Sequence, residues 1–321
     1  KPKSLDWKEP EYTFDYWMLK VNGDLEVLWQ KAFGGSKNDI VKSIIETSDG
    51  GFIIAGHSNS PISSGDVDYH MIYKGEESTV FLDTVSSGDK DSKNHGGYDL
   101  YLVKIDKEGE KIWDKSYGGS DDDYLYFIHE AIDGGYLLGG ISHSGKSGNK
   151  TTDNYGLNDY WVIKVDINGN KLWERSFGGD GRDWLEGISK IGQEGYLLTG
   201  YSDSKISGNK KAPNHGGYDI WATKIGKNGE YIWDNTYGGN KDDKIGGRQS
   251  GGAGVIPYFD GFILAGVSRS DGDSGTKSSK QFSGQSALDE EITLRDYWML
   301  NIDKSGKQNF DLSFGGTEDE V

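Results

Sequence analysis

Acidic side chains recur at a fixed place in this sequence, where they could bind a metal ion or take part in hydrolysis. Each lies six residues after the aromatic residue of an aromatic-Gly-Gly signature. Carboxylate oxygens are preferred ligands of Ca²⁺, so these acids are candidate metal ligands. They are Asp39, Asp123, Asp183 and Asp243, with Glu320 at the corresponding place in the last unit.

Two other roles for these acids remain open. Each carboxylate could instead close its own turn by accepting backbone N–H groups. A glycosidase or lyase would use two or three dissimilar carboxylates, one of them with a raised pKa. The recurring acids are equivalent from unit to unit, which argues against such differentiated roles. The sequence also contains no Cys nucleophile and no Gly-x-Ser-x-Gly or His-Glu-x-x-His motif.

Polar loops between the repeats contain a second set of candidate residues. These loops read Ser-Gly-Asn/Asp-Lys and, a few residues later, Asn-His/Tyr-Gly. A ring can stack on the apolar face of a sugar while amides bond to its hydroxyl groups. Asn, Gly and Ser are also simply common in turns, which is the alternative explanation. The candidate ligand-binding residues are Asn94, His95, Asn154, Tyr155, Asn214 and His215.

One β-hairpin pattern must position both sets of residues, and it occurs five times without a gap. Each copy opens with an Asp, has an aromatic residue fourteen positions later, and has the aromatic-Gly-Gly signature four positions after that. We expect the opening Asp to close the preceding loop or to pair with a neighbouring unit. These residues are Asp15, Asp99, Asp159, Asp219 and Asp296.

A second pair of strands is predicted between successive hairpins. Short apolar runs bounded by Gly, at 52–56, 136–140, 196–200 and 262–266, are typical of strands buried on both faces. Four short strands per unit of roughly 60 residues predict an all-β fold, a β-propeller with four-stranded blades. A β-sandwich would not repeat its sequence, and a solenoid usually has shorter coils.

The repeat also predicts how the blades divide the chain, with strands named A to D from the inside outward. We expect a single domain over 1–321, five blades, and an insert at 61–98 in a B–C loop. The recurring acids would then lie at the mouth of a central channel. The strands needed to close the ring are expected beyond Val321. The predicted segments are a C–D half-blade at 15–35, blades at 36–119, 120–179, 180–239 and 240–316, and the start of a further strand at 317–321.

Composition limits the classes of partner. The net charge of -17 argues against nucleic acid, whose phosphates need a basic surface, and against anionic lipid. No run approaches the roughly 20 apolar residues of a membrane span. Cys is absent, which excludes disulfides and thiolate metal sites. No signal peptide is visible at Lys1, so we expect a processed or a cytosolic chain.

The repeat resembles that of a family of exported proteins of Bacteroidota. The resemblance rests on the pattern Asp159-Tyr160-Trp161 through Asp166 and Gly169 to Trp173, followed by Phe177-Gly178-Gly179. These are propeller-like surface proteins or lipoproteins, often with a type IX secretion sorting tail. The hairpin is also distantly similar to the tryptophan-docking repeat of PQQ-type propellers. The resemblance implies an extracellular or outer-membrane location.

Together these observations predict a binding or scaffold protein that recognises a glycan or a protein partner through its B–C and D–A loops. One alternative is a polysaccharide-active glycosidase or lyase that uses the channel-mouth carboxylates. A second alternative is a purely structural module. Ca²⁺ is the only cofactor for which the sequence offers candidate ligands, and it offers no signature of another.

Overall fold

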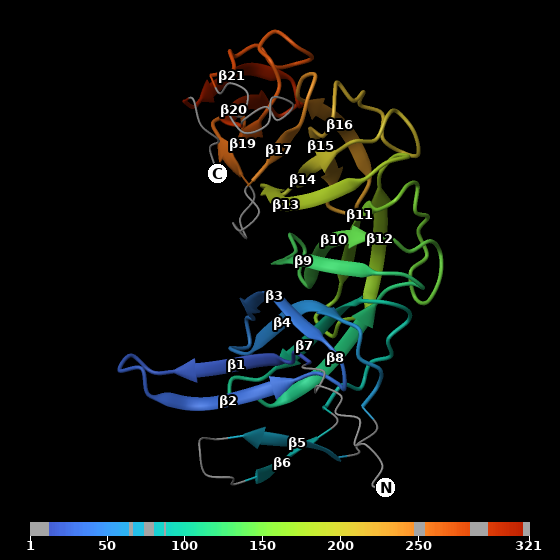
Figure 1. Cartoon of the computed structure of the whole chain (residues 1–321), viewed down its shortest axis with the longest axis vertical. Helices are drawn as coiled ribbons and strands as arrows, with labels where there is room; N and C mark the ends of the chain where they lie inside the picture. Colours follow the sequence, from blue (N-terminus) through green and yellow to red (C-terminus); the bar gives the residue numbers. More distant parts are fainter. Residues whose placement is uncertain are drawn as a thin grey trace, which may run out of the picture. The chain divides into compact units, whose positions relative to one another are not determined.

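The fold consists of antiparallel β-sheets. A computed structural model describes residues 13–63, 67–73, 80–86, 88–246, 254–282 and 295–316. Of the six sheets in these segments, three are four-stranded and one is five-stranded, and each of these four resembles a propeller blade (Figure 1). The same segments contain no helix long and apolar enough to cross a membrane. The predicted all-β, propeller-like architecture is confirmed, whereas the blade number, the blade boundaries and the closure of a ring stay predictions.

The chain divides into two compact units, of which the first comprises residues 1–94 and 98–116. It contains a hairpin of β1 (Tyr16–Val21) and β2 (Val27–Phe33). Its four-stranded sheet has the order β3 (Asp39–Glu46), β4 (Phe52–Ser58), β7 (Asp99–Ile105) and β8 (Lys111–Tyr117). The segment predicted as an insert, 61–98, holds the antiparallel pair β5 (Val67–Tyr73) and β6 (Val80–Ser86).

The second unit, residues 95–97 and 117–321, contains three further sheets. The first consists of β9 (Asp123–Glu130), β10 (Tyr136–Ser142), β11 (Asp159–Val165) and β12 (Lys171–Phe177). The second consists of β13 (Asp183–Ile191), β14 (Gly195–Ser202), β15 (Asp219–Gly226) and β16 (Tyr231–Tyr237). The third consists of β17 (Asp243–Ile245), β18 (Val255–Tyr258), β19 (Gly261–Ser268), β20 (Asp296–Asp303) and β21 (Gln308–Phe314).

Strands in each complete sheet pair in chain order, as expected of a blade. Four recurring acids begin the first strand of their sheets, namely Asp39, Asp123, Asp183 and Asp243. Four hairpin Asp residues begin the third strand, namely Asp99, Asp159, Asp219 and Asp296. In the last sheet β17 and β18 both pair with β19, so two short strands take the place of the single first strand of the other sheets.

Aromatic side chains fill the space between neighbouring sheets of the second unit. Tyr160 of β11 packs against Trp221 of β15, with ring centroids 4.6 Å apart. The Tyr160 hydroxyl donates to the Trp221 carbonyl oxygen at 3.1 Å, which satisfies a buried polar group. Tyr16 makes the corresponding contacts with Tyr101 in the first unit. The Tyr of the Asp-Tyr-Trp pattern therefore joins one sheet to the next.

A Gly-x-Ser-x-Ser segment recurs in the chain, at 56–60, 140–144, 200–204 and 266–270. A close approach of two backbones requires the first residue of each segment to be glycine. Between Leu185 and Gly187 the register of β13 against β14 shifts at a bulge, opposite Gly200. A Cβ atom at Gly200 would lie 1.8 Å from the carbonyl oxygen of Trp184. Only glycine fits there without movement of the backbone.

Replacing Gly200 with alanine should destabilise the fold by about 1–3 kcal/mol, because the bulge must open to admit the methyl group. Gly145→Ala is the matched control, since nothing lies within 4 Å of a Cβ at that position. Denaturant unfolding of both variants measures the difference. Equal stability of the two variants would show that the bulge does not require glycine.

Candidate functional site

The recurring acids close the turns in which they lie. Asp183 is fully buried, and its Oδ2 accepts hydrogen bonds from the Gly179 N–H and the Ser204 hydroxyl, both at 2.9 Å. The same hydroxyl accepts a bond from the Gly181 N–H. Asp39, Asp123 and Asp243 bond in the same way to the corresponding Gly and Ser residues. This is the turn-closing role that the sequence leaves open, and it explains the final Ser of Gly-x-Ser-x-Ser.

The hairpin Asp closes the preceding loop, as the sequence predicts. Asp159 Oδ2 accepts the backbone N–H of Tyr155 at 2.8 Å, and Asp219 Oδ2 accepts that of His215 at 2.6 Å. Both carboxylates are fully buried. A buried carboxylate therefore fixes the backbone position of Tyr155 and of His215.

Two carboxylates from different elements face each other across the aromatic-Gly-Gly turn. A Cβ atom at Gly178 would lie 2.2 Å from Asp159 Oδ1 and 2.8 Å from Asp183 Oδ2. The Oδ1 atoms of both aspartates are buried, and neither has a hydrogen-bond partner in the described part of the chain. Asp219 and Asp243 form the same arrangement around Gly238.

Burial in these pairs disfavours the charged form of each carboxyl group. It raises the pKa of Asp159 to about 7, to which the neighbouring charge of Asp183 contributes. Burial raises the pKa of Asp183 to about 6, although hydrogen bonds from Ser202, Gly179 and Ser204 act in the opposite direction. Protonation of one carboxyl group of each pair would relieve the repulsion between the two buried groups.

Calcium binding by Asp39, Asp123, Asp183 and Asp243 stays a prediction. Within the described residue ranges, no three or more His, Asp or Glu side chains come together in a group that could hold a metal ion. Each of the four carboxylates already accepts two hydrogen bonds on one oxygen. A metal ion would have to use the remaining oxygens together with the facing hairpin Asp.

A buried acid on the outermost strand anchors each B–C loop, and the sequence analysis missed it. Asp234 of β16 accepts the backbone N–H groups of Lys211 and Ala212 at 3.0 and 2.9 Å. The same carboxylate accepts the indole N–H of Trp221 at 3.0 Å. Asp114, Glu174 and Asp311 occupy the same place in the other sheets and bond to their own loops.

Hydrogen bonds determine the charge state of two of these acids. Burial would raise the pKa of Glu174, but hydrogen bonds from Lys171 and Thr151 outweigh it and hold the pKa below its usual range. The pKa of Asp311 is lowered in the same way, with bonds from Ser278, Ser279 and Trp298 outweighing burial. Both groups are therefore ionised acceptors at neutral pH.

A buried lysine completes each anchor. Lys210 is almost fully buried, donates to the Ala212 carbonyl oxygen at 2.6 Å and lies over the Trp221 ring. Burial lowers the pKa of Lys210, and the nearby charges of Asp183 and Asp234 oppose that shift. Lys90, Lys150 and Lys277 occupy the same place. These lysines end the Ser-Gly-x-Lys segments, so their recurrence was the signal that could have identified them.

The candidate asparagine side chains donate hydrogen bonds to backbone carbonyl oxygens. Asn154 Nδ2 donates to the His143 carbonyl oxygen at 2.9 Å. Asn214 Nδ2 donates to the carbonyl oxygens of Ser202 and Gly217, and Asn94 Nδ2 donates to that of Ser58. Their side-chain N–H groups are engaged in the fold, and contact with a ligand stays a prediction for all three.

The candidate aromatic residues Tyr155, His95 and His215 contact the following repeat. A Cβ atom at Gly208 would lie 2.7 Å from Tyr155 Cβ, and the same contact joins Gly148 to His95 and Gly275 to His215. Tyr155 keeps 39% of its surface exposed. Burial, followed by the charge of Lys210, lowers the pKa of His215, which is therefore neutral at pH 7.

Tyr155 lines a pocket of about 380 Å³ at the edge of the β12 sheet. The loop at 151–153 and the end of β12 at 175–177 form part of its wall. Asn209 and the segment 229–231 of the next repeat complete it. Tyr155 and Tyr231, which are 76 positions apart in the sequence, both line this pocket. His95, His215 and the recurring acids do not line it.

No protein-family model matches the sequence, and no curated protein matches it at a significant level. The resemblance to Bacteroidota surface proteins and to PQQ-type propellers therefore stays a prediction.

Stability should rise as the pH falls from 8 to 5. Folding raises the pKa of four carboxyl groups from the ordinary value of 3.8 to about 6 or 7, those of Asp159, Asp183, Asp219 and Asp243. Folding therefore takes up protons at pH values above 3.8. That contribution is present at low pH and is lost as the pH rises through 6 to 7. Thermal melting should show a midpoint several degrees higher at pH 5, since 1 kcal/mol shifts the midpoint by about 2–4 °C in a domain of this size.

The double variant Asp159→Asn and Asp219→Asn controls this experiment, because a neutral amide can donate to the facing carboxylate at any pH. It should show a smaller pH dependence than the wild type and a higher midpoint at pH 8. A chelator should leave the wild-type midpoint unchanged. A midpoint that falls on chelation would contradict stabilisation of the pairs by protonation and would support the calcium hypothesis.

Proposed function

We propose that this chain is a propeller-like binding module that recognises a neutral glycan in the pocket between Tyr155 and Tyr231. The observation that carries the proposal is the juxtaposition of two tyrosines with hydroxyl, amide and charged groups in one concave site. Aromatic faces accommodate the apolar face of a sugar, and the surrounding polar groups can bond to its hydroxyls.

The size and charge of the pocket support a small neutral ligand. Its volume of about 380 Å³ lies within the usual range for small-molecule sites, which is about 300–1,000 Å³. Lys146 and Asp153 form an ion pair of 2.8 Å at its rim. Arg175 and Glu230 contribute one further charge of each sign. The charges balance, so neither an anion nor a cation is favoured over a polyhydroxylated molecule.

The pocket is held in shape before a ligand arrives. Asn209 accepts the Gly178 N–H at 2.9 Å and donates to the Ser176 carbonyl oxygen at 2.7 Å. The hydroxyl of Tyr231 donates to Asp234 at 2.7 Å. Residues already fixed by the fold lose little conformational entropy on binding, which favours affinity.

The structural equivalence of the recurring carboxylates favours binding over hydrolysis. Asp39, Asp123, Asp183 and Asp243 have the same partners in their own turns. A glycosidase instead places two carboxyl groups in different environments on either side of one bond. The proposal includes the extracellular or outer-membrane setting that the repeat resemblance implies.

Tyr155→Ala should weaken glycan binding at least tenfold, because the ring supplies the exposed apolar face of the pocket. Binding should be screened on an array of neutral oligosaccharides and measured by calorimetry for the best ligand. Tyr155→Phe should retain most of the affinity, since it keeps the ring.

Leu172→Ala is the surface control for this experiment. Leu172 lies on β12, whose end forms part of the pocket wall, but it is exposed and does not itself line the pocket. A wild-type protein that binds no oligosaccharide on the array, or a ligand whose affinity Tyr155→Ala leaves unchanged, would contradict the proposal.

A further inference from the structure

Three repeats share a lysine on the third strand that reaches the turn between the first two strands. Lys104 pairs with Asp49 at 2.7 Å, and Lys224 pairs with Glu194 at 3.2 Å. Lys164 pairs with Asp133 and also donates to the Gly134 carbonyl oxygen. All three lysine side chains are nearly buried. In each of these repeats an ammonium group fills the space beside the turn.

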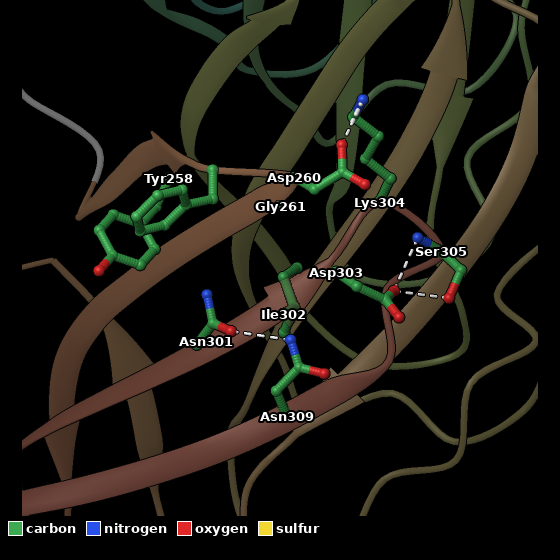
Figure 2. Close-up of a pocket in the computed structure, with 10 residues that line it drawn as sticks. Tyr258, Asp260, Gly261, Asn301, Ile302, Asp303, Lys304, Ser305 and Asn309 are labelled. Carbon is green, nitrogen blue, oxygen red and sulfur yellow. Dashed lines mark hydrogen bonds and ion pairs between the residues drawn. The ribbon is translucent and has the colours of Figure 1, made fainter.

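The last repeat has Asn301 at this position, and Asn301 is too short to reach the turn. Its Nδ2 donates to the Phe262 carbonyl oxygen at 3.1 Å, and its Oδ1 accepts from Asn309 at 2.8 Å. Asn309 itself stands where the other repeats have an aliphatic residue, such as Leu172. A pocket of about 440 Å³ remains between the turn at 258–261 and the turn at 303–305 (Figure 2).

The lining of this pocket has an excess of negative charge. Asp260 pairs with Lys304 at 2.8 Å, and Asp303 adds a second carboxylate. Figure 2 shows the Asp260–Lys304 pair and the Asn301–Asn309 pair on different sides of the opening, with Tyr258 at one end. Both partners of the Asp260–Lys304 pair are largely exposed, so solvent screens the attraction and a second cation can compete for Asp260.

The conformation and exposure of Phe259, at the aromatic end of the pocket, are energetically unfavourable for the folded chain. Phe259 is 92% exposed and has a φ of +48°, a conformation that L-residues other than Asn and Asp rarely adopt. Its ring lies edge-on to that of Tyr258, with centroids 4.5 Å apart. Strained and exposed apolar residues cluster at binding sites, and aromatic faces attract cations.

The opposite wall is rigid. The Trp233 indole donates to the Lys304 carbonyl oxygen at 3.2 Å, and the Tyr237 hydroxyl donates to that of Gly306 at 2.5 Å. Asn235 Nδ2 donates to the same Gly306 oxygen. These bonds fix the turn that carries Asp303 and Lys304.

We propose that this pocket binds a primary alkylammonium group, supplied either by a lysine side chain of a peptide or by a free diamine. The group would take the place of the lysine that reaches the turn in the three four-stranded sheets, which is Lys104, Lys164 or Lys224. The ammonium group would donate to the Asp260 carboxylate and to the side-chain oxygen of Asn309. Its alkyl chain would lie against Tyr258 and Phe259. The site is independent of the proposed glycan pocket and shares no residue with it.

Calorimetry with the purified chain tests the ligand class. The probes are Nα-acetyl-lysine methylamide, whose side-chain amine is free, cadaverine, the uncharged analogue Nα-acetyl-norleucine methylamide, and lactose. The lysine amide or cadaverine should bind at least tenfold more tightly than the norleucine amide, and the tighter of the two identifies the source. Equal binding of the norleucine amide, or binding of lactose in place of the amines, would overturn the proposal.

Asn301→Lys tests the location, because it installs the residue of the other repeats and supplies an ammonium group within the chain. It should abolish amine binding and leave the thermal midpoint equal or higher. Asn301→Ala keeps the pocket open and should retain binding. Amine affinity that Asn301→Lys leaves unchanged would place the site elsewhere and contradict the proposal.

Discussion

The structure depends on a buried carboxylate on the outermost strand that must find hydrogen-bond donors. A carboxylate removed from water is strongly destabilising unless it is bonded, so its partners are obligatory. Glu174 and Asp234 each take one donor from a tryptophan of the adjacent strand and at least one from the backbone of the B–C loop. One side chain thereby ties two strands and a loop together, and the buried lysine balances its charge.

This constraint explains where ligand sites can form. The loops are polar, but their amides, carboxylates and lysines are used internally, so the loop interiors offer few groups to a ligand. Both pockets lie instead at places where one repeat meets its neighbour or departs from the common pattern. Tyr155 extends from an anchored loop toward the next repeat and lines one pocket. Asn301 is shorter than the lysine at the same position in three other repeats, and the second pocket lies beside it.

Sequence reasoning identified the parts that repeat and missed the contacts that the repeats make. The strand beginnings at Asp159 and Asp183, and the loop-closing role of Asp159, follow from position within the pattern. The burial of Lys210 does not, because a lysine in a polar loop is ordinarily exposed, and only the distant Asp234 and Trp221 reverse that preference. The Asn301 substitution is visible in the sequence, but its consequence depends on how far the lysine reaches in other repeats.

Hydrogen exchange of the B–C loop amides is the most direct test of the anchoring carboxylate. The amides of Thr151, Lys211 and Ala212 donate to buried acids, so they should exchange as slowly as strand amides such as that of Leu198. Asp234→Ala should release the amides of Lys211 and Ala212 while Thr151 stays protected by Glu174. Exchange of all three at the rate of an unstructured peptide in the wild-type protein would contradict the account.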